Sequence, residues 1–104
     1  MKRGKAQDVL EFEWDKANIA HIAKHNVSPQ EAEDIFFDKN NVTDEDLKHS
    51  FVEPRFLIIG RTSKKRILYQ VFTIRGTKIR VISSRDINRK EVQLYEKKTD
   101  NSKV

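Results

Sequence analysis

Residues 78–89 read KIRVISSRDINR and predict the strand around which the rest of the chain is arranged. Alternation puts Ser83 on the apolar face of this strand and places Arg80 and Ser84 on the opposite face. An arginine at mid-strand needs a partner or a ligand, because an unpaired buried guanidinium is strongly disfavoured. With Arg85 just past the strand's end, two arginines and two hydroxyls would suit a phosphate. This stretch therefore predicts a phosphate-recognising site.

Two more strands are expected immediately before it. Residues 55–62 and 66–74 are rich in β-branched and aromatic side chains, and turns at 63–65 and 75–77 separate the three segments. Turns this short enforce antiparallel pairing of neighbouring strands. The sequence therefore predicts an antiparallel β-meander in the second half of the chain.

The first half predicts a short strand at 9–14 and then a helix, which Asp15 caps, to about residue 25. The i, i+3, i+4 spacing of its apolar residues predicts a buried stripe at Ile19, Ile22 and Ala23. Asn26 stands where a helix can end in a left-handed residue. A helix that follows so closely would form a hairpin with the first.

The second helix carries a clear start signal. Ser28-Pro29-Gln30-Glu31 combines an N-cap serine, a proline at the first helical position and a glutamate at the third, which is a capping box. The core-facing residues of this helix are predicted to be Ala32, Ile35 and Phe36. Further on, residues 41–43 predict a weak strand, 44–50 an exposed acidic loop, and Asn88 the cap of a last helix ending near 98.

These elements predict one α+β domain at residues 9–98, between a flexible basic stretch at 1–8 and a flexible polar tail at 99–104. An N-terminal helical hairpin would lie on one face of the antiparallel sheet, and the C-terminal helix would follow it. The chain has no cysteine and no apolar run of membrane-spanning length, which favours the cytoplasm.

The net charge of +5 is unevenly distributed. Residues 61–90 hold ten Lys or Arg against one acid, Asp86, so this block carries +9 and the remaining chain −4. Such asymmetry favours an anionic partner, nucleic acid being the first candidate. A solubilising surface is the alternative interpretation.

No cofactor or metal motif stands out. His21 and His25 are four residues apart on one helix, but no third ligand accompanies them. The inventory that remains suits metal-free RNA cleavage, which needs a base, an acid and cations that stabilise the phosphorane. Arginine fits the last role because its planar fork binds two phosphate oxygens.

Several of these residues have a structural alternative. Lys24 and His25 end the first helix, where the helix dipole favours cations, so His25 would serve as a cap or as a catalytic group. Arg80 would otherwise form an ion pair with Glu53 or Asp86. Arg55 and Arg61, at opposite ends of one strand, would otherwise be solvated at the sheet edge.

Short motifs in a fixed order resemble the signatures of the BrnT toxin family. They are KHNVSPQEA at 24–32 with FD at 37–38, EPR at 53–55 with IGR at 59–61, and IRVISSR at 79–85 with RKE at 89–91 and Tyr95. The resemblance spans about residues 12–96. Asn26 replaces a usual glycine, Ser84 a usual alanine and Lys16 a common proline, and no charged site residue is lost.

The resemblance implies a RelE-like fold and a metal-independent endoribonuclease that inhibits translation. It also implies a BrnA-like antitoxin, operon repression through the antitoxin's DNA-binding part, and a complex of two toxins with two antitoxins. The expected catalytic residues are Lys24, His25, Glu53, Arg55, Arg80 and Arg85. The expected RNA-binding residues are Arg61, Lys64, Lys65, Arg66, Lys78 and Arg89. The alternative function is a non-catalytic nucleic-acid-binding module or corepressor.

Overall fold

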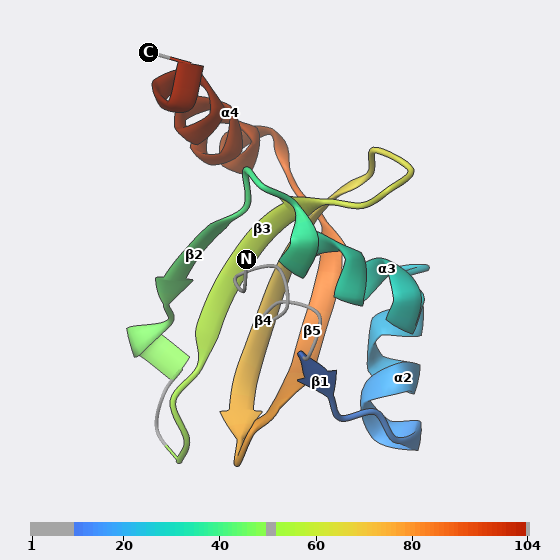
Figure 1. Cartoon of the computed structure of the whole chain (residues 1–104). Helices are drawn as coiled ribbons and strands as arrows, with labels where there is room; N and C mark the ends of the chain where they lie inside the picture. The colour runs from blue at the N-terminus through green and yellow to red at the C-terminus, as the bar shows by residue number, and fades with distance from the viewer. Residues whose placement is uncertain (1–9, 50–51, 104) are drawn as a thin grey trace.

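The computed structural model describes residues 10–49 and 52–103, which form an α+β domain built on a five-stranded mixed sheet (Figure 1). The strands are β1 (Glu11–Phe12), β2 (Val42–Glu45), β3 (Phe56–Arg61), β4 (Ile67–Arg75) and β5 (Lys78–Asp86). The helices are α2 (Lys16–Ala23), α3 (Pro29–Asp34) and α4 (Arg89–Lys103), with short 3-10 turns η1 (Ile35–Phe37) and η2 (Leu47–His49).

The predicted meander is present, but the sheet is not wholly antiparallel. The strand order is β1-β5-β4-β3-β2, and β2 to β5 pair antiparallel with their neighbours. β1 instead pairs parallel with the start of β5, at Glu11↔Lys78 and Phe12↔Ile79. A parallel neighbour is possible here because the two helices of the N-terminal half and the first three strands of the meander separate β1 from β5 in the chain.

A β-bulge in β5 changes which side chains share a face. Val71 pairs with Ser83 and Phe72 with Val81, so Ile82 has no partner of its own in β4. Beyond this bulge the alternation is reversed. Ser84 is therefore buried on the core side, contrary to the alternation predicted from sequence. Arg85 lies within β5 rather than past its end, and it shares a face with Arg80.

The helix caps follow the sequence closely. Asp15 caps α2 by accepting hydrogen bonds from the backbone N–H of Ala17 and Asn18. Asn26 has a φ of 58°, the left-handed conformation expected of it. The capping box of Ser28 and Glu31 is present at the start of α3. Two helices can therefore be joined by a very short turn.

The core lies between the sheet and these helices. Its buried members are Ile22, Val27, Ala32, Ile35, Ile58, Leu68, Phe72, Ile79 and Val81, with Phe12, Trp14, Phe36 and Phe56 packed against them. The predicted stripe of α2 is only partly right, since Ile19 is 40% exposed and Ala23 is also exposed. Asn18 is buried instead, because its amide donates to the carbonyl of Val81 in the edge of β5 that β1 leaves unpaired.

Two segments extend further than the sequence suggested. β2 continues to Glu45, so Asp44 and Glu45 of the predicted acidic loop at 44–50 belong to a strand. Leu47–His49 forms a 3-10 turn, and residues 50–51 lie outside the described ranges. α4 continues to Lys103 rather than ending near 98, and Figure 1 shows it projecting from the end of the sheet where β5 finishes. The predicted N-terminal stretch at 1–8 also lies outside the described residues. Within the described ranges, every helix falls short of what a membrane span requires.

Candidate nucleic-acid cleavage site

A groove of about 590 Å³ lies on the face of the sheet that points away from the helices. Its floor is formed by Tyr69 and Val71 of β4, which alternate with the buried residues Leu68 and Gln70, and by the consecutive residues 82–85 of β5. Four separate segments contribute to its walls. The polar and charged lining residues include His25, Asp46, Lys48, Arg55, Tyr69, Ser83 and Arg85.

Arg85 is held firmly in this groove. Its Nη1 and Nη2 donate to the two carboxylate oxygens of Glu91 at 2.9 and 2.8 Å, and Nη1 also donates to the carbonyl oxygen of Asp86. The guanidinium lies over the ring of Tyr69, with Cζ 4.2 Å from the ring centroid. The hydrogen bond that Arg85 donates to Glu91 raises the pKa of Arg85, which therefore stays fully charged at any working pH. This arginine is a fixed cation.

Arg55 immediately precedes β3 and lines the groove. Together with Glu53 and Phe56, it also lines a neighbouring hollow. Its carbonyl oxygen accepts a hydrogen bond from the backbone N–H of Asp46 at 2.8 Å. This bond brings the segment after β2 to the groove, and with it the side chains of Asp46 and Lys48. Two arginines and a lysine therefore face one space, alongside one carboxylate and one imidazole.

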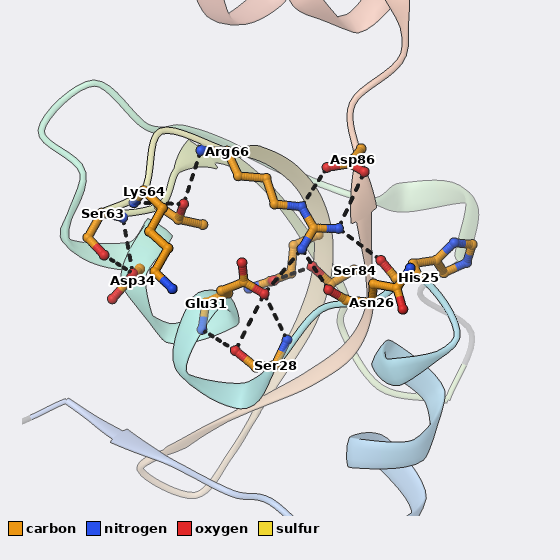
Figure 2. Close-up of polar contacts among 12 residues, drawn as sticks. His25, Asn26, Ser28, Glu31, Asp34, Ser63, Lys64, Arg66, Ser84 and Asp86 are labelled. Carbon is orange, nitrogen blue, oxygen red and sulfur yellow. Dashed lines mark hydrogen bonds and ion pairs between the residues drawn. The ribbon is translucent and has the colours of Figure 1, made fainter.

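His25 reaches the groove because Arg66 braces the turn that carries it. Arg66 donates hydrogen bonds to Asp86, to Glu31 and to the carbonyl oxygens of Asn26 and His25 (Figure 2). The four donor–acceptor distances are 2.7, 3.1, 2.7 and 2.8 Å. The side chain of Arg66 is 23% exposed. The RNA-binding role predicted for Arg66 is untested, but this geometry favours a structural role.

Ser84 also has an internal partner. Its hydroxyl donates to Gln70 at 2.7 Å, and the amide of Gln70 donates to the carbonyl of Ala32 in α3 at 2.9 Å. Both polar side chains are buried. Ser84 thus connects β5 to the helices through Gln70, and both Ser83 and Ser84 are among the residues that line the groove.

Two predicted catalytic residues lie in ion pairs outside the groove. Arg80 binds Asp15 at 3.0 and 3.2 Å, so the expected partners Glu53 and Asp86 are both wrong. The side chain of Arg80 is 13% exposed, and its hydrogen bond lowers the pKa of Asp15. Glu53 instead binds Arg75 at 3.3 Å. This geometry supports the structural alternative for Arg80.

The other residues that were predicted to act in catalysis or to bind RNA lie at separate places on the surface. Lys24 is the C-cap of α2, and its exposed side chain is not among the groove-lining residues. Arg61 lies over the ring of Tyr95 at 5.6 Å beside a different hollow. Lys78 begins β5 and so lies roughly 23 Å along the strand from Arg85. Lys64 and Lys65 occupy the exposed β3–β4 turn, and Arg89 is exposed at the start of α4.

Sequence reasoning missed three of the polar and charged lining residues. Lys48 and Asp46 fell in a segment with no periodicity, and only pairing with the backbone of Arg55 brings them to the groove. Tyr69 was detectable, since it alternates with Leu68 and Gln70 on β4 and must face away from the core. No cluster of three or more His, Cys, Asp or Glu arranged for a metal ion occurs among residues 10–49 and 52–103.

Residues 14–91 match a family model described as "Ribonuclease toxin, BrnT, of type II toxin-antitoxin system". The match covers about three quarters of the chain and includes every residue that lines the groove. A comparison with curated proteins found no match.

Proposed function

The chain belongs to the BrnT family of ribonuclease toxins of type II toxin–antitoxin systems, and we propose that the groove between Arg55 and Arg85 is where it cleaves RNA. The observation that carries this proposal is the convergence of cations and proton-transfer groups on one open face. Arg55, Arg85 and Lys48 reach the groove from three segments, and His25 reaches it from a fourth.

The chemistry we propose is attack of a 2′-oxygen on the adjacent phosphorus. Arg55 and Arg85 bind the non-bridging oxygens and stabilise the dianionic phosphorane, because a guanidinium fork matches a phosphate edge. His25 and Asp46 are the groups that exchange protons with the 2′-hydroxyl and the departing 5′-oxygen. These steps require no metal ion, and the products are a 2′,3′-cyclic phosphate and a 5′-hydroxyl.

The family assignment extends the proposal to partners. We infer that RNA cleavage inhibits translation in the cytoplasm and that the fold is RelE-like, which the meander and the N-terminal helices support. A BrnA-like antitoxin would neutralise the toxin in a complex of two toxins with two antitoxins. The antitoxin's DNA-binding part would then let the complex repress their operon.

The test is incubation of the purified protein with RNA, with and without EDTA, followed by analysis of the product ends. Cleavage that persists in EDTA and leaves 2′,3′-cyclic phosphates is expected. Magnesium-dependent cleavage with 5′-phosphate products would contradict the mechanism. Salt-sensitive RNA binding without turnover would instead support the non-catalytic binding module.

A further inference from the structure

We propose that Glu91, which lies behind the groove rather than in its lining, is the positioning residue that aims Arg85 at the substrate phosphate. The inference rests on the proposed function of the groove. It concerns a side chain on α4, outside the β-sheet that forms the groove floor, and it makes the first turn of α4 part of the active site's support.

The pair is asymmetric in exposure. The side chain of Arg85 is 38% exposed and lines the groove, whereas that of Glu91 is only 13% exposed and is not among the lining residues. Glu91 engages Nη1 and Nη2 of Arg85 through both of its oxygens, at 2.9 and 2.8 Å. A bidentate contact fixes the plane of the guanidinium as well as its position. The ring of Tyr69 supports the same plane at 4.2 Å.

The same carboxylate is built into the start of α4. Its Oε1 accepts the backbone N–H of Asn88 at 2.9 Å, and the Asn88 side chain accepts the backbone N–H of Glu91 at 2.9 Å. This reciprocal arrangement is a capping box. Glu91 can hold Arg85 in place only while the first turn of α4 is formed, so the helix and the groove are coupled through one carboxylate.

A positioning role and a purely electrostatic role predict changes in different kinetic constants. Removing a carboxylate beside Arg85 makes the groove more positive, so RNA binding should stay the same or tighten. Loss of orientation instead weakens the contact with the transition state, which lowers kcat. A fall in kcat without a rise in KM therefore identifies positioning.

The chain carries its own matched control. Glu31 is also the third residue of a capping box, at Ser28, and it also binds an arginine, Arg66, at 3.1 Å. Arg66 does not line the groove and keeps its bonds to Asp86 and to two carbonyl oxygens without Glu31. Glutamine preserves the capping box at both sites.

The experiment compares the wild type, Glu91→Gln and Glu31→Gln in steady-state RNA cleavage and in thermal unfolding. We expect Glu91→Gln to lower kcat by about tenfold or more with KM unchanged or lower, and Glu31→Gln to keep kcat within about twofold. Equal kcat values for both variants, or a loss of kcat that only parallels a loss of thermal stability, would overturn the inference. If the wild type itself does not cleave RNA, the proposed function fails first and this inference fails with it.

Discussion

At the scale of single residues, two arginines of the same strand have different environments. Arg85 binds a carboxylate that lies behind it, and its guanidinium faces the groove. Arg80 binds Asp15, the residue that caps α2, and lies outside the groove lining. Residue type and position in the motif cannot distinguish these two roles, because the difference depends on partners that are distant in sequence.

Replacing Arg80 tests this distinction. Arg80→Met should lower the thermal unfolding temperature, because Asp15 loses the partner that joins the start of α2 to β5. Cleavage of RNA by the folded variant should stay within about twofold of the wild type. Loss of cleavage with unchanged unfolding temperature would restore Arg80 to the catalytic set.

The Glu91–Arg85 pair also predicts a pH dependence of stability. The hydrogen bond from Arg85 lowers the pKa of Glu91 from its ordinary value of 4.5, so the folded state binds fewer protons than the unfolded state. The stabilisation is fully present above pH 4.5 and is lost as the pH falls through the lowered value. Glu91→Gln should flatten the dependence of unfolding free energy on pH below 4.5, by at most about 1.4 kcal/mol per pH unit. Urea unfolding at several pH values measures this pH dependence. The same slope below pH 4.5 in Glu91→Gln and in the wild type would contradict the prediction.

At the scale of secondary-structure elements, the bulge in β5 decides which residues meet in the groove. Arg80 and Arg85 are five residues apart, so strict alternation would put them on opposite faces. The unpaired Ile82 shifts the alternation and brings Arg85 beside Tyr69 on the groove face. The three strands and their order were predictable from turns and apolar runs. The bulge was not, because nothing local in the sequence marks it.

Gly60 tests how closely the elements pack. A Cβ at this position in β3 would lie 2.8 Å from the Cβ of Ile35 and 2.9 Å from its carbonyl oxygen. Gly60→Ala should therefore destabilise the fold by about 1–3 kcal/mol, because η1 cannot move away without opening the core.

Gly76 supplies the comparison. A Cβ there would meet nothing within 4 Å, and only its φ of +63° is unfavourable for other residues. Gly76→Ala should cost about 1 kcal/mol. Urea unfolding at constant m-value gives both numbers, and a smaller loss at Gly60 than at Gly76 would show that η1 packs less tightly on β3 than described.

At the scale of the whole molecule, folding redistributes the charge asymmetry of the sequence. Within residues 10–49 and 52–103, four of the ten cations in residues 61–90 form ion pairs with carboxylates: Arg66, Arg75, Arg80 and Arg85. The partners Asp15, Glu31 and Glu53 come from the part of the chain that precedes this block. The basic block was therefore a sound indication of an anionic partner but a poor guide to which cations bind it.

The salt dependence of RNA binding measures how many cations make phosphate contacts. If Lys48, Arg55 and Arg85 make them, the slope of log K against log salt should be about −2, since each contact with a single strand contributes about −0.7. Contacts from all ten cations of residues 61–90 would give about −7. A slope near the second value, measured with a cleavage-resistant RNA, would show that the groove is only part of a much wider binding surface.

The candidate site was only partly predictable from the sequence, because some of its residues reach the groove only through tertiary contacts. Arg55, Arg85 and His25 lie in short motifs that could be recognised, and the structure brings all three to the groove. Lys48 arrives through a backbone hydrogen bond after β2, and Glu91 acts from the first turn of α4, beyond the end of β5. Both depend on tertiary contacts that no local pattern encodes.

The central claim is that the groove, rather than the basic surface in general, cleaves RNA. The most direct measurement is kcat/KM for Arg55→Gln beside Lys78→Gln, which removes the same charge at the far end of β5. We predict a loss of about 100-fold or more for Arg55→Gln and less than about threefold for Lys78→Gln, with both variants folded. Equal losses in the two variants would contradict the claim.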